Sequence, residues 1–99
     1  MTEELEVRQN VAESRFEVSL GDQFGVIVYR KDGATYDLFH TEVPPAYGGK
    51  GIGDRLAHDA LEMIKVEGGK VVPSCPFIKV YMRRHKEYQA LLQQEGNPC

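Results

Sequence analysis

The sequence has little cysteine and no long hydrophobic run. Its 99 residues include two cysteines, Cys75 and Cys99, which form neither a disulfide framework nor a metal-binding spacing. No apolar segment approaches the roughly 20 residues that a membrane-spanning helix needs. The acidic start at residues 1–4 does not have the composition of a signal peptide. We therefore expect a reduced, cytoplasmic protein that binds no metal and enters no membrane.

The sequence also lacks a basic stripe interleaved with aromatic residues, so we expect no nucleic-acid partner. The net charge is −3, but the charge is unevenly distributed. Residues 1–42 hold four Lys or Arg against nine Asp or Glu, whereas residues 43–99 hold eight against six. The second half is therefore the better place for a phosphate-bearing ligand.

The length allows one hydrophobic core, and so a single domain over residues 1–99 with its core at about 15–93 and a tail at 94–99. Alternating apolar and polar residues predict an antiparallel meander of strands. In the last of these strands the alternation places Tyr36, Leu38 and His40 on one face. Asp32-Gly33 suits the hairpin turn before it. The predicted strands are residues 15–20, 24–30 and 35–43, with an additional edge strand at 5–10.

A helical pattern follows the meander, which ends at Pro44-Pro45. Apolar residues at helical spacing predict a helix over residues 51–67, ended by Gly68-Gly69. A short strand at 70–72 would pair beside the last meander strand and complete a right-handed β-α-β crossover. Pro76 suits the first position of a second helix, and one or two further helical turns follow it. The predicted fold class is α/β (α+β).

The most informative segment is residues 44–53, in which four of ten residues are glycine. Glycines can direct backbone N–H groups to one point, and a helix start adds unpaired N–H groups and a positive dipole end. This pattern is typical of a phosphate site, and its alternative is an ordinary tight connection between two elements. A P-loop is excluded because Gly51, not Ser or Thr, follows Lys50. A dinucleotide fingerprint is excluded because Leu56 stands where its third glycine is required.

A Gly-x-Gly loop between an antiparallel meander and a helix resembles the coenzyme A site of the GNAT acetyltransferase superfamily. The family signature is Gln/Arg-x-x-Gly-x-Gly/Ala, and the chain reads Gly48-Gly49-Lys50-Gly51-Ile52-Gly53. Gly48 departs from the signature, which removes one side-chain contact. Two further stretches, His40-Thr41-Glu42-Val43-Pro44 and Pro73-Ser74-Cys75-Pro76, are similar to short single-domain N-acetyltransferase-like proteins. The resemblance covers about residues 16–92.

The resemblance implies a reduced GNAT fold that binds acetyl-CoA, with an unidentified amine, small molecule or protein, as acceptor. It implies that backbone N–H groups of residues 48–53 hold the pyrophosphate, and that Lys50 and Arg55 screen its charge. The pantetheine arm would bond to the backbone of Thr41 and Val43. We expect a monomer or a weak dimer. The implied cofactor-binding residues are Thr41, Val43, Gly48, Gly49, Lys50, Gly51, Ile52, Gly53, Arg55 and Tyr81.

Two residues are candidates for the chemistry. Cys75 precedes Pro76 and is a predicted helix N-cap, where the dipole favours a thiolate. It would accept the acetyl group, act as a base, line the sulfur end of the tunnel, or serve only as a small buried hydrophobe. His40 near a strand end suits a general base, or a histidine hydrogen-bonded within the sheet. If their strand ends adjoin, the two would form a Cys/His pair.

Other side chains have a structural interpretation beside the functional one. In many GNAT enzymes a tyrosine in the helix that holds Tyr81 protonates the leaving thiolate, but the spacing of Tyr81 with Ile78 favours a core position. Glu42 would position the acceptor amine or lie on the surface. Residues 83–86 would reach the ribose phosphate or form a solvated basic face.

Three functions fit these observations. The first is an acetyl-CoA-dependent N-acetyltransferase. The second is a CoA or acyl-CoA binding module with little catalysis, because the chain lacks the acceptor-shaping N-terminal helices of larger family members. The third is a partner-binding domain with a vestigial site.

Overall fold

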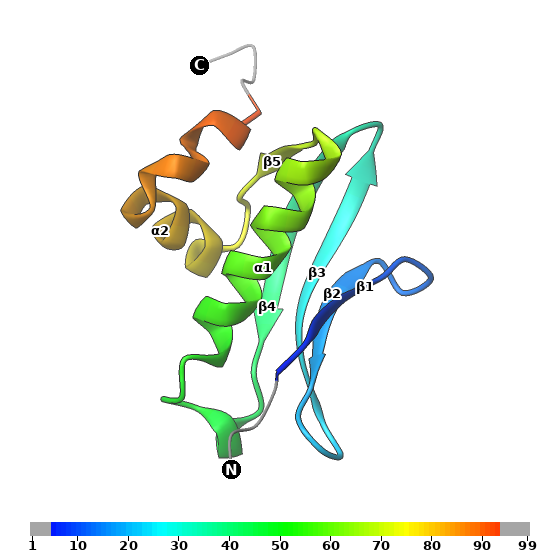
Figure 1. Cartoon of the computed structure of the whole chain (residues 1–99), viewed down its shortest axis with the longest axis vertical. Helices are drawn as coiled ribbons and strands as arrows, with labels where there is room; N and C mark the ends of the chain where they lie inside the picture. The colour runs from blue at the N-terminus through cyan, green and yellow to red at the C-terminus, as the bar shows by residue number, and fades with distance from the viewer. Residues whose placement is uncertain (1–4, 94–99) are drawn as a thin grey trace.

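The protein, described here by a computed structural model over residues 5–93, is a five-stranded sheet with its helices in one layer (Figure 1). The sheet order is β1-β2-β3-β4-β5, with β1 to β4 antiparallel and β5 parallel to β4. The predicted meander, crossover helix and C-terminal helices are therefore confirmed. The predicted tail at 94–99 lies outside the described residues. The elements are β1 Val7–Asn10, β2 Arg15–Ser19, β3 Phe24–Asp32, β4 Thr35–Glu42, the 3-10 helix η1 Pro45–Tyr47, α1 Ile52–Glu67, β5 Lys70–Val72, α2 Pro76–Arg84 and the 3-10 helix η2 Lys86–Leu91.

The core lies between one face of the sheet and the two helices. Alternate strand residues are buried on this face because successive side chains of a strand point to opposite sides. The helix α1 crosses the sheet diagonally, and α2 lies beside α1 (Figure 1). The alternating residues on the other sheet face are half-buried or exposed, so we call it the open face. The buried side chains include Phe16, Val18, Ile27, Tyr29, Tyr36 and Leu38 of the sheet and Ile52, Leu56, Ala57, Ala60, Leu61 and Ile64 of α1.

A β-bulge interrupts the alternation in β4. Leu38 lies opposite Tyr29 of β3 and His40 lies opposite Val28, so Phe39 is an extra residue without an opposite partner. Such an insertion bends the strand and shifts its alternation by one residue. Each β4 residue after the bulge therefore lies on the opposite face of the sheet from the one that strict alternation predicts.

The bulge decides where His40 and Thr41 point. Thr41 lies opposite Ile27, which is fully buried, so Thr41 is on the helix face. His40 lies opposite Val28 and is on the open face. The sequence pattern placed His40 on the face of Tyr36 and Leu38. That prediction was wrong, because one inserted residue reverses the period-two pattern.

The remaining differences are at element ends. The strand β3 runs to Asp32, past the predicted end at residue 30, and Gly33 makes the turn with φ 64°. The predicted glycine stop of α1 is confirmed, since Gly68 is a left-handed C-cap. No helix within residues 5–93 has the length and apolar character needed to cross a membrane.

Candidate functional site

The glycine loop leads into the start of α1 through two residues with a left-handed backbone conformation. Gly49 and Gly51 have φ of 78° and 76°, in the left-handed region that favours glycine. Gly51 is the N-cap of α1, and no side chain caps the helix. A Cβ built on either glycine meets nothing within 4 Å. The helix α1 thus begins without a side-chain cap, with open space beside the two glycines that precede it, and an uncapped helix start of this kind can bind an anion.

Two other glycines of the signature have structural roles, one in a turn and one in the contact between α1 and α2. The N–H of Gly48 donates to the carbonyl of Pro45 at 3.1 Å, as part of the turn η1. This N–H is therefore already used within the protein, which argues against the predicted place of Gly48 in a phosphate site. Gly53 lies inside α1, where an added Cβ would be 3.1 Å from Cζ of Phe77. Glycine at this position lets the Phe77 ring of α2 approach α1.

The two predicted cations differ in availability. The Arg55 guanidinium donates to Asp59 Oδ2 at 2.8 Å and to the carbonyl of Leu5 at 2.7 Å. Burial opposes ionisation of Asp59, but the hydrogen bonds from Arg55 and His58 outweigh it and lower the pKa of this carboxyl. The Arg55 guanidinium is therefore occupied by hydrogen bonds within the protein. Lys50 is exposed and forms no ion pair with any residue from 5 to 93, so it is the cation available to a phosphate.

The outer edge of β4 is only partly paired. The short strand β5 covers Thr35 to Asp37, and the N–H of Cys75 then donates to the carbonyl of Leu38 at 2.9 Å. No strand of the described chain pairs with this edge over residues 39–42. An unpaired strand edge can bond an extended ligand as it would bond another strand. The edge runs directly into η1 and the glycine loop.

The cysteine lies where β4 and β5 separate. Cys75 is the N-cap of α2, with Pro76 in the first turn, as predicted. Cys75 is 7% exposed, and its Sγ donates a hydrogen bond to Oγ1 of Thr41 at 3.4 Å. The thiol and the Thr41 hydroxyl therefore contact each other on the helix face of the sheet, beside the unpaired part of β4. The sequence pattern missed this contact because it depends on the bulge in β4.

His40 is not brought to the cysteine. Its imidazole is on the open face, 54% exposed, with Nε2 3.3 Å from Oε1 of Glu42. The Cys/His pair considered from the sequence is therefore replaced by a Cys75–Thr41 pair, since the bulge puts Thr41 and not His40 on the helix face. Glu42, the other residue considered for the acceptor, is also exposed.

Tyr81 is buried in α2, in agreement with the core position that its spacing favours. Its ring stacks on His85 with centroids 4.0 Å apart. Burial raises the pKa of Tyr81, and the negative charge of Asp54 raises it further. A hollow of about 400 Å³ between α1 and α2 adjoins Tyr81, Phe77 and Arg84. A tyrosine that holds its proton firmly beside a cavity is suited to donate a hydrogen bond.

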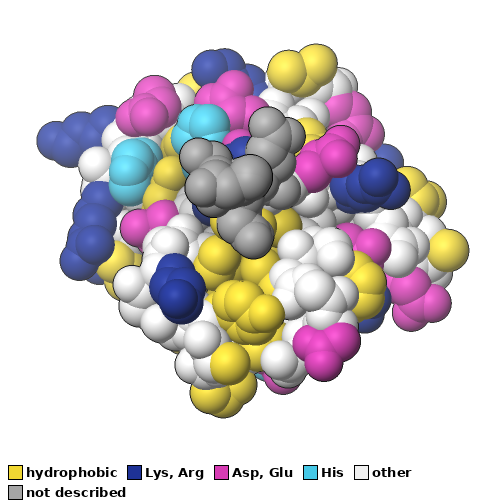
Figure 2. Space-filling view, turned by 60° about the horizontal axis from the view of Figure 1, so that its bottom comes forward, with side chains coloured by type: hydrophobic (Ala, Val, Ile, Leu, Met, Phe, Trp, Pro, Cys, Tyr) yellow, Lys and Arg dark blue, Asp and Glu magenta, His cyan; other side chains and the backbone are white. Residues whose placement is uncertain are grey.

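Another hollow, of about 510 Å³, adjoins the loop on the side of the turn between β2 and β3. Lys50, Tyr47 and Leu20 contribute to it, and the Tyr47 hydroxyl donates to the Leu20 carbonyl at 2.6 Å. This bond attaches η1 to the sheet. Figure 2 shows this end of the molecule, where hydrophobic side chains gather in the middle and charged ones surround them.

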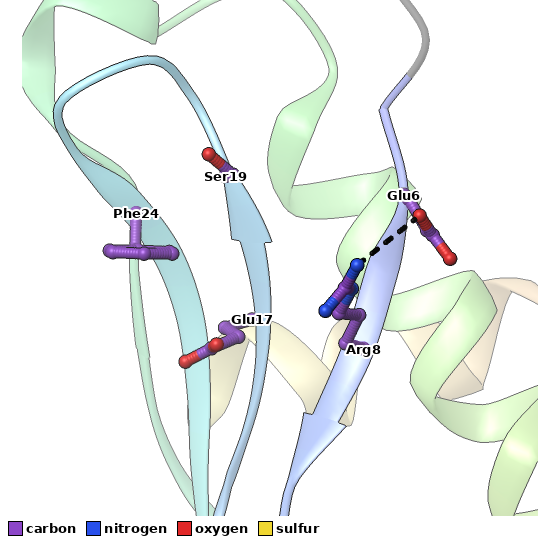
Figure 3. Close-up of a pocket in the computed structure, with 5 residues that line it drawn as sticks. All are labelled: Glu6, Arg8, Glu17, Ser19 and Phe24. Carbon is purple, nitrogen blue, oxygen red and sulfur yellow. Dashed lines mark ion pairs between the residues drawn. The ribbon is translucent and has the colours of Figure 1, made fainter.

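A hollow of similar size lies over β1, β2 and the start of β3 (Figure 3). Its ion pair between Arg8 and Glu6 spans 3.9 Å with both side chains more than 70% exposed, so it is a weak surface pair. None of the predicted site residues lines it. Within residues 5–93, no three His, Cys, Asp or Glu side chains gather closely enough to hold a metal ion.

Comparison with known proteins identifies the family and the fold of this chain. A family model for the GCN5-related N-acetyltransferases matches residues 15–91. The solution structure of a GCN5-like protein from Staphylococcus aureus superposes with a TM-score of 0.70 and 27% identity, covering 94% of this chain and 93% of that one.

Relatives in animals match a shorter segment. The proteins named NATD1 of Homo sapiens and Gallus gallus are 43% identical over 49 residues, which is 50% of this chain. The match covers 43% of the human protein and 44% of the chicken one. That of Xenopus tropicalis is 38% identical over 61 residues, 61% of this chain and 56% of the relative. The chain thus spans about half the length of these relatives.

The family match covers most of the chain, including β2 to β4, the glycine loop, α1 and α2. The structural neighbour covers nearly all of it. The resemblance that the sequence motifs carried is confirmed: this chain belongs to the GCN5-related N-acetyltransferase family.

Proposed function

We propose that this chain binds acetyl-CoA and transfers its acetyl group to an amine. The observation that carries the proposal is the uncapped start of α1, behind two left-handed glycines with open space before them. It adjoins the unpaired edge of β4, which ends at a buried thiol. A ligand with phosphates at one end, an extended arm and a thioester at the other would match the helix start, the strand edge and the thiol in turn.

In this proposal the chain binds the ligand mainly through its backbone. N–H groups of residues 49–53 hold the pyrophosphate, and the exposed Lys50 balances its charge. The arm bonds to the outer edge of β4 at Thr41 and Val43. The thioester then lies close to the pair Cys75–Thr41, away from bulk water.

Two routes of transfer fit these groups. In the direct route, the amine attacks the acetyl carbonyl, loses a proton, and the CoA thiolate takes up a proton. In the covalent route, the Cys75 sulfur bonds to the carbonyl carbon while the bond to the CoA sulfur breaks, and the thiol proton passes to the CoA thiolate. An amine then attacks acetyl-Cys75, forms the amide and returns its proton to the Cys75 sulfur.

A second function, a CoA or acyl-CoA binding module, is favoured by one observation. His40 and Cys75 are on different faces of the sheet, so the structure does not join the predicted base to the predicted nucleophile. A module that only binds acetyl-CoA needs the loop and the β4 edge but no such pair.

Intact-protein mass spectrometry after incubation with acetyl-CoA tests these alternatives. We expect one acetyl group on Cys75, lost when an amine is added. The variant Cys75→Ala should lose the label, and the matched variant Cys99→Ala should keep it. Turnover with unlabelled Cys75 would favour the direct route, and CoA binding without turnover would favour the binding module. Absence of any CoA binding would contradict the proposal.

A further inference from the structure

The central strand β3 is apolar on both faces of the sheet. Its core-facing residues are buried, while Val26 and Val28 point to the open face and are half-buried there. Phe24 lies on the same face and is 47% exposed. The solvated face of an antiparallel sheet normally carries polar residues, and a strand that is apolar on both sides is typical of one covered on both sides. Among the described residues, however, the helices lie in one layer on the other face (Figure 1).

Charged side chains of β2 lie beside this apolar strip of Phe24, Val26 and Val28. Arg15 lies opposite Val28, on the same face. Glu17 lies opposite Val26, and its carboxylate accepts a hydrogen bond from Arg15 Nε at 2.8 Å. Both charged side chains are less than one-third exposed. An apolar centre with charged side chains around it is the usual anatomy of a protein–protein interface.

The strand β4 repeats this order of charges on the other side of the strip. His40 lies opposite Val28, and Glu42 lies opposite Val26. The His40 and Glu42 side chains are 3.3 Å apart and both are more than half exposed. Each flanking strand therefore has a basic residue beside Val28 and an acidic residue beside Val26.

These rows are complementary to a second copy of the same face. A twofold axis that lies between two such sheets and crosses β3 at Ile27 places the Val26 row of each copy over the Val28 row of the other. Arg15 of one copy then lies over Glu17 of the second copy. Each of these charges gains an opposite charge from the second copy in addition to its partner in its own chain.

The strand β4 follows the same rule. His40 of one copy lies over Glu42 of the second copy, since they flank the same two rows. An axis that runs along the strands would instead place Glu17 over Glu42, and two carboxylates repel each other. The charges therefore favour the axis that runs across the strands.

The hollow over β1, β2 and the start of β3 would receive a side chain in this arrangement (Figure 3). Phe24 and two carboxylates line it, together with Arg8. Phe24 and Arg30 lie equally far from the axis along β3, so Arg30 of the second copy lies over the hollow. Arg30 is opposite Asp37 within the sheet, but its guanidinium stands over the Phe39 ring, 4.5 Å from the centroid. A second ring would cover the other side of this exposed guanidinium, which is a favourable contact.

The size of the face sets the strength of the contact. From β1 to β4 it is about 15 Å wide, and from Phe24 to Arg30 it is about 20 Å long, at the usual spacings of a sheet. Such a face is at the small end of protein–protein interfaces, so we expect a weak dimer and not an obligate one.

We propose that the open face binds the open face of a second copy of this chain, through a twofold axis that crosses β3 at Ile27. The occupant of the face is therefore a second copy, because the order of charges on β2 and on β4 is complementary to itself. The inference goes beyond the acetyl transfer proposed above and does not rest on it, since the Cys75–Thr41 pair lies on the opposite face of the sheet.

Exchange of one ion pair tests the proposal by sedimentation velocity over a series of protein concentrations. For the unmodified chain we expect a dimer with a dissociation constant of about 10–100 μM, as suits a small interface. Arg15→Glu alone or Glu17→Arg alone places like charges over each other and should raise this constant more than about tenfold. A mixture of the two single variants should form a mixed dimer, and the double variant Arg15→Glu/Glu17→Arg should recover the homodimer.

A matched variant controls for the change in net charge. Glu87 is exposed and lies in η2, which packs against α2. Glu87→Arg changes the net charge as Glu17→Arg does, and it should leave the dissociation constant within about threefold. The proposal is overturned if the unmodified chain stays monomeric at millimolar concentration, if both single variants still form the dimer, or if their mixture forms none.

A second measurement uses the unmodified chain, because Glu17 accepts hydrogen bonds from Arg15 and Asn10 and its substitution is expected to lower stability. In a mixture of two differently labelled copies, NMR should show a nuclear Overhauser effect between the Val26 methyls of one copy and the Val28 methyls of the other. Dilution should shift the amide signals of these two valines. Dilution shifts confined to the helices would overturn the proposal, since they would place the contact on the other face.

Discussion

The residues that build the loop act through backbone conformation more than through side chains. Gly49 and Gly51 have positive φ, and each faces open space, so neither glycine is needed to avoid a clash. What they provide is the left-handed turn that directs backbone N–H groups outward at the start of α1. Gly53 is different, because a side chain there would meet Phe77.

The variant pair Gly51→Ala and Gly33→Ala isolates the function of the loop glycine. Both positions have positive φ, 76° and 64°, and neither has an atom within 4 Å of the added Cβ. Each substitution should lower the free energy of unfolding by about 1–2 kcal/mol, because alanine is strained in this region. Only Gly51→Ala should weaken CoA binding, by about tenfold, measured by isothermal titration calorimetry. An equal loss of affinity in Gly33→Ala would show that general destabilisation, not the loop, causes it.

At the scale of elements, two tyrosines hold α1 in place. The Tyr36 hydroxyl of β4 donates to Glu67 at the end of α1, at 2.6 Å. The buried Tyr88 of η2 donates to Glu62 in the middle of the same helix, also at 2.6 Å. With its far half attached to β4 and η2, α1 presents its start, and so the loop, at a defined place.

These bonds predict how stability depends on alkaline pH. Burial raises the pKa of Tyr36 to about 12 from the ordinary 10, and the hydrogen bond to Glu67 adds to the shift. The folded state therefore favours the protonated phenol. This stabilisation is complete below pH 10 and is lost as the pH rises from 10 to 12, where the unfolded state binds fewer protons.

The variant Tyr36→Phe should weaken this dependence without abolishing it, because burial and the hydrogen bond to Glu62 raise the pKa of Tyr88 as well. It should also lower the free energy of unfolding at neutral pH by about 1–2 kcal/mol, because it removes a hydrogen bond to a charged group. Urea unfolding followed by circular dichroism over a pH series measures both effects. If the variant lost stability above pH 10 as steeply as the parent chain, Tyr36 would not be the responsible group.

The whole molecule has one core, so anything bound to its loop stabilises the entire fold. CoA at a hundred times its dissociation constant should raise the free energy of unfolding by about 2.7 kcal/mol. For a chain of this size the midpoint of thermal unfolding should rise by roughly 10–20 °C. Lys50→Gln should reduce the rise, and so should added salt, because part of the affinity is electrostatic. No shift at millimolar CoA would contradict every function that requires CoA binding.

Much of the fold and part of the site could be predicted from local pattern. Gly68 ended α1 where predicted, and Cys75 became the N-cap of α2, because caps and turns depend on a few neighbouring residues. The hydrogen bond from Arg55 to the Leu5 carbonyl could not be predicted, since the two residues are 50 positions apart in the chain. Nor could the use of the Gly48 N–H, which depends on η1 forming after β4.

The sequence by itself determined the order of the elements, the glycine loop at the start of α1 and the family resemblance, all of which depend on residue type and spacing. The tertiary structure alone decided which chemical groups meet. One extra residue in β4 placed Thr41 beside the Cys75 thiol, moved His40 to the open face and held Arg30 over Phe39, away from Asp37. The reason is that strand alternation has a period of two, so a single bulge reverses every face beyond it, and a bulge is visible only once the partner strand is paired.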